Sequence, residues 1–320
     1  MQGLVTVFGG SGFIGTQVVR ALAKQGWRVR VAVRRPHLAF RMRMLGDVGQ
    51  IQVVQANIRN GASVARALEG AEACVNLVAV MQERGRQGFL SLHTTAAEKV
   101  AEAAKAAGVQ RFVHMSALGA DAQSQSKYAR TKALGEEAVR KAFPGAVVVR
   151  PSIVFGQEDS FFNMFARMAT VAPALPLFGG GATKFQPVFV ADVAQAVALA
   201  ATKPEHAGKT FELGGPAVFS FKEILELILR ETGRSRPLLP VPWFAAKLMG
   251  SAGDLVSGII AAPITSDQVI LLQTDNVVSG AQPGLAELGV SPTTVEAIVP
   301  TYLFLYRKGG QYAPLPEGAL

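Results

Sequence analysis

The sequence predicts an α/β fold, in which a doubly wound parallel sheet is joined to a smaller, mostly helical C-terminal region. Up to about residue 150, short apolar runs alternate with amphipathic stretches, as in repeated strand–helix–strand units. The apolar runs contain few polar residues, which is typical of strands buried on both faces. Beyond residue 150 the alternation loosens and Pro and Gly mark loops.

Each element of the first 150 residues follows from this alternation. Three expected helices are followed by Gly26, Gly70 and Gly108, which occupy the usual stop position. Two further helices are expected at 192–202, with Asp192 as the N-terminal cap, and at 221–232. The expected strands are 4–8, 28–33, 51–55, 73–80, 111–115 and 146–149. The helices between them are 12–25, 61–69, 88–107 and 126–142.

The composition supports a globular chain of one core and one attached region. Hydrophobic residues make up 49% of the 320 and charged residues 17%, which provides a sizeable core and argues against disorder. The only cysteine, Cys74, excludes an internal disulfide and a thiolate metal cluster, and indicates a reducing compartment. We expect 1–150, with 185–215 completing the sheet, to form the core. The segments 151–184 and 216–320 are then a substrate-side or partner-docking region.

The N-terminus carries no basic leader or cleavage site, so the sequence predicts no signal peptide and a cytoplasmic protein. The least polar segment, 241–262, is interrupted by charged and glycine residues, so it is expected to lie against a membrane or a partner rather than to span a bilayer. The net charge of +9 fits anionic lipid or an acidic protein surface, and without any nucleic-acid motif we predict no nucleic-acid partner.

Histidines do not suggest a metal site. His37, His93 and His206 are scattered, and no Cys-x-x-Cys or His-x-x-x-His spacing occurs, so no metal is predicted. His114 lies within the fifth expected strand and is interpreted as a satisfied core residue.

A glycine-rich turn between the first strand and the first helix predicts a Rossmann dinucleotide site. Glycines at its first, fourth and seventh positions permit a tight turn, close approach of backbone N–H groups to a pyrophosphate, and close packing of helix on strand. We expect cofactor contacts from Gly9, Ser11, Gly12, Phe13, Ile14 and Gly15.

The second strand favours NADP(H) over NAD(H). It ends in Arg34 and Arg35, where a protein selecting NAD places a carboxylate for the ribose hydroxyl. Two guanidinium groups instead offer charge-assisted donors to a 2′-phosphate, although a solvated basic edge is the alternative. NAD(H) therefore stays open as a second cofactor. Asn57 and Ile58 are expected to flank the adenine. Further contacts are expected from Val78, Ala79, Met115, Pro151 and Ile153.

Tyr128 and Lys132 are the candidate catalytic pair, since residues four apart share one face of a helix. The ammonium would favour the phenolate and lower the tyrosine pKa from about 10, and it would also bond the nicotinamide ribose. An ordinary exposed pair is the alternative.

The glycine spacing, the Tyr128–Lys132 pair and the run Arg150-Pro151-Ser152 resemble extended and atypical short-chain dehydrogenases/reductases of the epimerase/dehydratase type. The resemblance covers about two-thirds of the chain. It implies proton exchange by Tyr128 while the nicotinamide moves a hydride.

Active members of this group place a Ser or Thr beyond the fifth strand. Here Ala117 takes that position and Ser116, a tentative catalytic residue, lies one residue early. The missing donor would cost about 10²-fold or more in rate.

A closer resemblance is to the NADPH-binding Rossmann accessory subunits of respiratory complex I and their bacterial relatives. It implies a structural NADPH, no established turnover, and a place on the inner face of the membrane near the quinone-side arm, with contact to lipid or quinone. The segment 240–263 would be the docking surface. The aromatic group Phe155, Phe161, Phe162 and Phe165 is expected to pack around a helix, and the alternative is the wall of a substrate or quinone cavity. The resemblance rests on Ser126-Lys127-Tyr128, Glu136-Glu137, Ala142-Phe143-Pro144, the residues 150–159 and the residues 186–193.

Three functions stay open on the sequence alone. The first is a cofactor-binding accessory or assembly protein of a membrane complex such as complex I. The second is an NADP-dependent oxidoreductase or epimerase-like enzyme that uses Tyr128 and Lys132 on a small or isoprenoid carbonyl. The third is a sensor of the NADPH/NADP⁺ ratio that changes partners.

Overall fold

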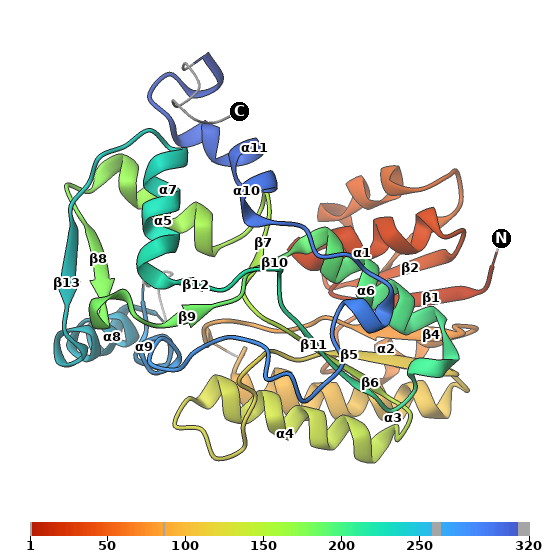
Figure 1. Cartoon of the computed structure of the whole chain (residues 1–320). Coiled ribbons are helices and arrows are strands. Elements are labelled where there is room, and N and C mark those ends of the chain that lie inside the picture. Colours follow the sequence, from red (N-terminus) through yellow and green to blue (C-terminus); the bar gives the residue numbers. More distant parts are fainter. Residues whose placement is uncertain (1, 86, 258–263, 313–320) are drawn as a thin grey trace.

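The computed structural model describes residues 2–85, 87–257 and 264–312. Its centre is a sheet of seven strands, all parallel to their neighbours (Figure 1). In spatial order these are β11 (Thr210–Leu213), β6 (Val147–Pro151), β5 (Arg111–Met115), β4 (Ala73–Asn76), β1 (Leu4–Phe8), β2 (Arg28–Val33) and β3 (Ile51–Gln55).

Helices cover both faces of this sheet. On one face lie α1 (Phe13–Lys24) and α6 (Val190–Thr202), which pack against each other and against the valines of β1 and β2. On the other face lie α2 (Gly61–Leu68), α3 (Ala96–Ala106), which continues a π-helical turn η3 (Leu90–Thr95), and α4 (Lys127–Ala142). Figure 1 shows the two layers above and below the strands.

The strand order fixes where a ligand can bind. The chain proceeds outward from β1 to β2 and β3, then returns to the other side of β1 with β4 and proceeds outward again. A crevice therefore opens at the carboxyl ends of β1 and β4, the topological switch point of the sheet.

The expected fold class is confirmed, and most element boundaries agree to within two residues. Gly26, Gly70 and Gly108 follow α1, α2 and α3 with positive φ angles, as a left-handed helix stop requires. The expected strand 73–80 is too long, because β4 ends at Asn76. The side chain of Asn76 accepts a hydrogen bond from the Val78 N–H (3.2 Å), so the chain turns out of the sheet.

Asp192 does not cap α6. The helix begins at Val190, with Phe189 at the cap position, and places Asp192 in the first turn. Its carboxylate accepts bonds from Thr293 N (2.7 Å) and Thr293 Oγ1 (3.1 Å), so it ties the later chain to the helix.

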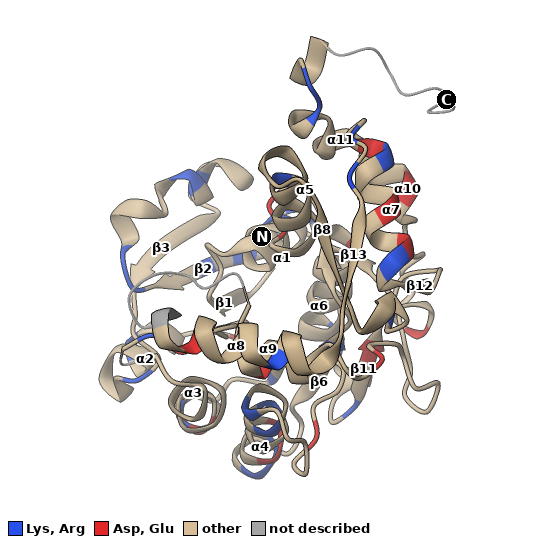
Figure 2. Cartoon of the chain, turned by 90° about the vertical axis from the view of Figure 1, so that its left-hand side faces the viewer, with Lys and Arg blue, Asp and Glu red and all other residues tan. Residues whose placement is uncertain are grey.

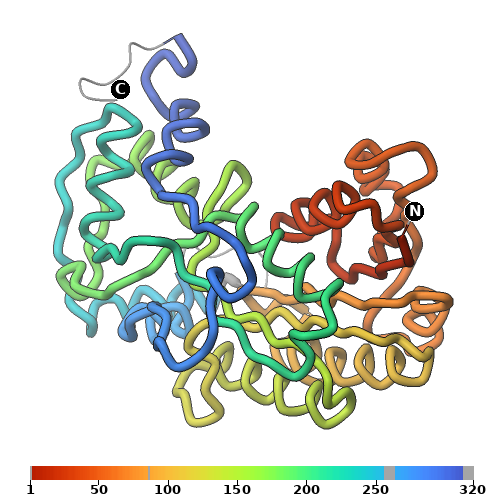
Figure 3. Tube along the Cα trace, turned by 45° about the vertical axis from the view of Figure 1, so that its right-hand side comes forward, coloured from red at the N-terminus to blue at the C-terminus, as the bar shows by residue number. Residues whose placement is uncertain are grey.

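Most of the rest of the chain forms a second lobe with its own core (Figure 3), whereas Leu285, Leu288 and Val290 pack into the core of the first lobe. Phe155, Phe162 and Phe165 are buried there among tilted and edge-to-face aromatic contacts, so these side chains are core packing rather than an open wall. Its helices are α5 (Phe161–Val171), α7 (Phe221–Glu231), α8 (Trp243–Ser257), α9 (Ser266–Leu271), α10 (Val295–Ile298) and α11 (Pro300–Leu303). Its short strands pair as β7 (Val154–Phe155) with β10 (Val188–Phe189), β8 (Leu175–Phe178) with β13 (Leu238–Val241), and β9 (Lys184–Phe185) with β12 (Phe219–Ser220).

Candidate dinucleotide site

The glycine turn leaves no room for side chains at two of its positions. Gly9 adopts a φ of +80°, which L side chains rarely adopt, and its carbonyl accepts the N–H of Gly12 (3.1 Å). A Cβ on Gly15 would collide with Gly9 O and lie 2.7 Å from the Gly10 Cα. The first turn of α1 therefore packs directly on the backbone that follows β1.

The N-terminus of α1 is open to a ligand. Its cap residue, Gly12, has no side chain that could bond the first-turn amides. In the part of the chain that the structure describes, no hydrogen bond engages the N–H groups of Phe13 or Ile14. Free N–H groups and the positive end of a helix fit a phosphate, so this turn fits the pyrophosphate of a dinucleotide.

The surface beyond β2, where the adenosine was expected, is cationic. Arg34 and Arg35 are both exposed beyond β2, and Arg34 donates to Gln87 Oε1 (3.0 Å). Asn57 lies beyond β3 with its side-chain oxygen bound by Arg59 N (3.1 Å). Ile58 is buried in the core beneath this position, so little of its side chain is available to an adenine ring.

The remaining expected contacts share one edge of the sheet. Val78 and Ala79 follow β4, Met115 ends β5, Pro151 ends β6, and Ile153 comes two residues later. These strands are neighbours, so their carboxyl ends lie side by side. A Cβ on Gly9 would lie 3.3 Å from Val78 N, which places this edge against the glycine turn.

Lys132 is a buried ammonium that reaches the same edge. Its side chain extends from α4 and Nζ donates to the carbonyl of Met115 (2.7 Å). Burial lowers the pKa of Lys132 to about 8, while the carboxylate of Glu136 opposes that shift. A ribose hydroxyl at the end of β5 would find this donor in place.

Tyr128 does not have the lowered pKa that the sequence predicted. Its partly buried ring makes edge contacts with His93 (centroids 5.3 Å apart) and Phe89 (5.8 Å). Desolvation and the carboxylate of Asp267 raise its pKa to about 12. The expectation is wrong because the ring is desolvated, the Lys132 ammonium bonds the Met115 carbonyl, and the negative charge of Asp267 disfavours the phenolate.

Asp267 is the residue that sequence reasoning missed. From α9 it accepts hydrogen bonds from Ser126 Oγ (2.8 Å), Lys127 N (2.6 Å) and Tyr128 N (3.2 Å), and it thereby holds the N-terminus of α4. It lies 140 residues from Lys127 in the sequence, so no local pattern links the two.

Several buried polar side chains lie around Lys132. His93 Nε2 accepts the Val80 N–H (3.1 Å), so Nδ1 carries the proton toward Thr131 Oγ1 (3.1 Å). Burial, with Lys132 adding to it, lowers the pKa of His93 to about 3, so the imidazole is neutral. Within the described chain His114 Nε2 and the hydroxyl of Ser116 have no partner, so His114 is buried but not fully satisfied. A ligand at the end of β5 would supply a partner for Ser116.

Neither a cluster of metal-ligating side chains nor a membrane-spanning helix occurs among the described residues. No cluster of three or more His, Cys, Asp or Glu side chains there could hold a metal ion. None of the helices in those same ranges has both the length and the apolar character that crossing a bilayer requires.

Fold and site together define a dinucleotide-binding α/β protein of the Rossmann type. Residues 5–214 match the model of the NAD dependent epimerase/dehydratase family, and the chain belongs to that family. This is a family of nicotinamide-dinucleotide proteins.

Known relatives include both a respiratory subunit and an enzyme. The chain is 36% identical to NADH dehydrogenase (ubiquinone) 1 alpha subcomplex subunit 9, mitochondrial, of Arabidopsis thaliana, over 97% of this chain and 80% of that protein. It is 37% identical to the ceramide reductase of Caulobacter vibrioides over 55% of this chain and 54% of that protein. A dTDP-glucose 4,6-dehydratase of Streptomyces venezuelae, solved with NAD, shares the fold with a TM-score of 0.71 at 20% identity, covering 96% and 97% of the two chains.

Proposed function

We propose that this protein binds NADPH as a structural cofactor and serves as an accessory subunit of a complex I-type respiratory enzyme. The observation that carries the proposal is the uncapped N-terminus of α1 behind the glycine turn, at the same sheet edge as the buried ammonium of Lys132. Respiratory subunits similar over nearly the whole chain support the accessory role.

The preference for NADPH over NADH rests on the end of β2. Arg34 and Arg35 are exposed there and no carboxylate follows the strand before Asp47. A 2′-phosphate would accept charge-assisted bonds from both guanidinium groups, whereas a ribose hydroxyl would lack the carboxylate that usually binds it.

The residues expected around the nicotinamide support a structural role for the cofactor rather than a catalytic one. Ala117 supplies no hydroxyl to polarise a carbonyl, and the pKa of Tyr128 is raised rather than lowered. Tyr128 then acts as a neutral hydrogen-bond donor, and Lys132 holds the ribose. In this reading Ser116 bonds the cofactor rather than a reacting group.

Helix α8 is the proposed docking surface for the membrane complex. Its small residues Ala246, Gly250 and Gly253 are buried, and a Cβ on Gly250 would lie 2.8 Å from the Ser266 Cα of α9. Trp243 packs against the core of the second lobe, whereas Phe244 (76% exposed) and Leu255 (84% exposed) face outward. Helix α8 crosses the front of the molecule in Figure 2. Residues 258–263 of the expected docking segment lie outside the described residues. The protein would be peripheral on the inner face of the cytoplasmic membrane.

Purified protein tests the cofactor role. We expect one NADPH per chain to survive gel filtration, to raise the melting temperature, and to resist oxidation by quinones, aldehydes and nucleotide sugars. Membranes solubilised with mild detergent should yield the protein together with respiratory subunits. Loss of NADPH on gel filtration, or isolation without any respiratory subunit, would refute the proposal.

A reductase is the second candidate, because Tyr128 and Lys132 share one face of α4 and a similar protein is a ceramide reductase. Turnover of a carbonyl substrate that Tyr128→Phe abolishes and Tyr312→Phe leaves intact would establish it. Tyr312 is the control because its side chain is exposed in the C-terminal lobe.

A further inference from the structure

An exposed surface of mixed basic and apolar character follows β2. Here the chain forms two short 3-10 turns, η1 (Pro36–Leu38) and η2 (Phe40–Leu45). Leu38, Phe40, Met44 and Val48 are all more than half exposed, and the guanidinium group of Arg43 lies 5.1 Å from the Phe40 ring centroid. The basic–apolar patch consists of Leu38, Phe40, Arg41, Arg43, Met44 and Val48.

Buried neighbours hold the patch outward. Ala39 and Met42, which alternate with patch residues, are buried in the core of the first lobe. The side chain of Gln50 donates to the carbonyls of Ala23 (2.7 Å) and Trp27 (3.0 Å) and accepts the N–H of Asp47 (2.8 Å). The backbone of the segment is therefore anchored at both sides, and the apolar side chains point into solvent from a fixed scaffold.

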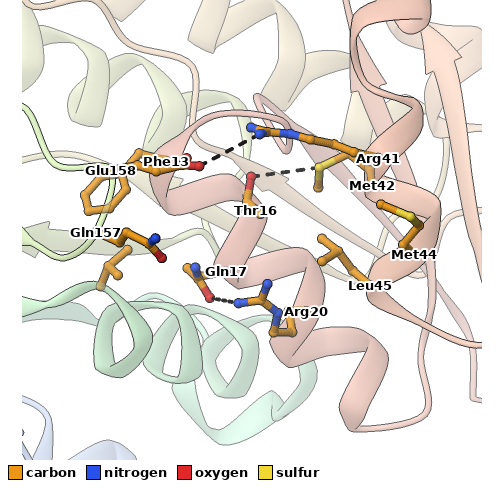
Figure 4. Close-up of a pocket in the computed structure, with 11 residues that line it drawn as sticks. Phe13, Thr16, Gln17, Arg20, Arg41, Met42, Met44, Leu45, Gln157 and Glu158 are labelled. Atoms are coloured by element: carbon orange, nitrogen blue, oxygen red, sulfur yellow. Dashed lines mark hydrogen bonds and ion pairs between the residues drawn. The ribbon is translucent and has the colours of Figure 1, made fainter. Parts of the chain in front are cut away.

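A cavity of about 250 Å³ opens beside the patch, between η2 and the outer face of α1 (Figure 4). Met44 and Arg41 line it on one side, and Arg20 lines it on the other. Arg41 also forms an exposed ion pair with Glu158 (3.8 Å). The cavity thus joins two guanidinium groups to the apolar side chains of the patch.

We propose that the basic–apolar patch docks on an anionic phospholipid bilayer. The inference rests on the proposed function at a membrane and names the surface that contacts lipid. Beyond Arg34 and Arg35, which are assigned to the cofactor, residues 36–50 contain Arg41, Arg43 and one acidic residue, Asp47, in a chain of net charge +9. Arginines that alternate with exposed apolar side chains can bind lipid phosphates while the apolar groups enter the headgroup region.

The arrangement favours a bilayer over a protein groove. Arg41 and Arg43 come between the exposed apolar residues Phe40 and Met44. The turns that carry them protrude at the edge of the molecule, above β3 in Figure 2 and at the upper right of Figure 3. A protein groove would instead require a contiguous apolar centre with charge at the rim. The patch also lies away from α8 in Figure 1, so lipid contact leaves that helix free.

Vesicle co-sedimentation of the full chain tests the proposal. The vesicles are phosphatidylcholine alone, or equal parts of phosphatidylcholine and phosphatidylglycerol. We expect binding to the anionic vesicles only. Arg41→Gln with Arg43→Gln should weaken it about 30-fold, since each arginine near an anionic surface contributes about 1 kcal/mol. Phe40→Ser with Met44→Ser should weaken it as well.

Lys203→Gln with Lys209→Gln is the matched control, because it removes two exposed charges just before β11, at the opposite edge of the sheet from β3. It should retain binding within about threefold. An equal loss of vesicle binding in the arginine and lysine variants would overturn the proposal. So would the absence of binding to anionic vesicles, which would leave an acidic protein surface as the partner of the patch. An NADPH-dependent rise in melting temperature is measured for every variant. If this rise persists while vesicle binding is absent, only the lipid-docking proposal is wrong. If the rise itself is absent, the proposed cofactor function is wrong.

Discussion

Two alanine substitutions in the glycine turn should separate cofactor binding from folding. At Gly12 the φ angle is −81° and an added Cβ would lie 3.4 Å from Gly9 O, an ordinary contact. We expect Gly12→Ala to change the free energy of unfolding by no more than about 1 kcal/mol. The methyl group would nevertheless stand at the N-terminus of α1, where the pyrophosphate must approach, so NADPH affinity should fall at least about tenfold.

Gly15→Ala should instead reduce the stability of the fold as well as the affinity for NADPH. Its Cβ would collide with Gly9 O and crowd Gly10, both of which are backbone and cannot rotate away. The overpacking should cost about 3 kcal/mol, which corresponds to a fall in melting temperature of about 4 °C for a chain of this size. Affinity for NADPH should also fall, because α1 must shift away from the turn.

The assay combines thermal unfolding without ligand and calorimetric titration with NADPH. Gly61→Ala is the control, since that glycine opens α2 with nothing within 4 Å of an added Cβ. It should leave NADPH affinity unchanged within experimental error and change the free energy of unfolding by no more than about 1 kcal/mol. The reasoning would be refuted if Gly12→Ala bound NADPH like the unaltered protein, or if it unfolded as easily as Gly15→Ala.

Three further predictions concern the two ends of the cofactor. Arg34→Ala with Arg35→Ala should lower the affinity for NADPH by about 10- to 100-fold, which corresponds to the loss of charge-assisted hydrogen bonds. The affinity for NADH should fall by less than about threefold. Calorimetry with both dinucleotides checks this, and equal losses would contradict it. The pKa of Lys132 is lowered to about 8, so its ammonium is lost as pH rises through 8. NADPH affinity should then fall by up to about tenfold per pH unit, a step that Lys132→Met removes and that a flat profile would contradict. Asp267→Asn should lower the pKa of Tyr128 from about 12 toward its ordinary value and the melting temperature by a few degrees. A phenolate absorbance titration, with Asp267→Asn and Tyr128→Phe combined as reference, checks this, and an unchanged titration would count against it.

The sheet and its covering helices could be predicted because their signals are local. Apolar runs, amphipathic periods and the stops at Gly26, Gly70 and Gly108 each depend on a few adjacent residues. The glycine turn was likewise identifiable, since its position after β1 and before α1 is readable from the chain alone. The edge strand β11 was expected only as part of a longer segment, because it is four residues long and carries Glu212.

Electrostatics at the nicotinamide end could not be predicted from sequence. The spacing of Tyr128 and Lys132 places both on α4, but burial depth and hydrogen-bond partners depend on the tertiary fold. The ammonium bonds the Met115 carbonyl, and Asp267 arrives from the second lobe. Asp192 illustrates the same limit, because its partner Thr293 lies 101 residues away.

Locating the pyrophosphate tests the account most directly, in a crystal grown with excess NADPH. We expect its oxygens within hydrogen-bond distance of the backbone N–H groups at the start of α1, next to Gly12, and the nicotinamide ribose within reach of Lys132 Nζ. Dinucleotide bound elsewhere on the chain, or a turn that stays empty at saturating NADPH, would contradict it.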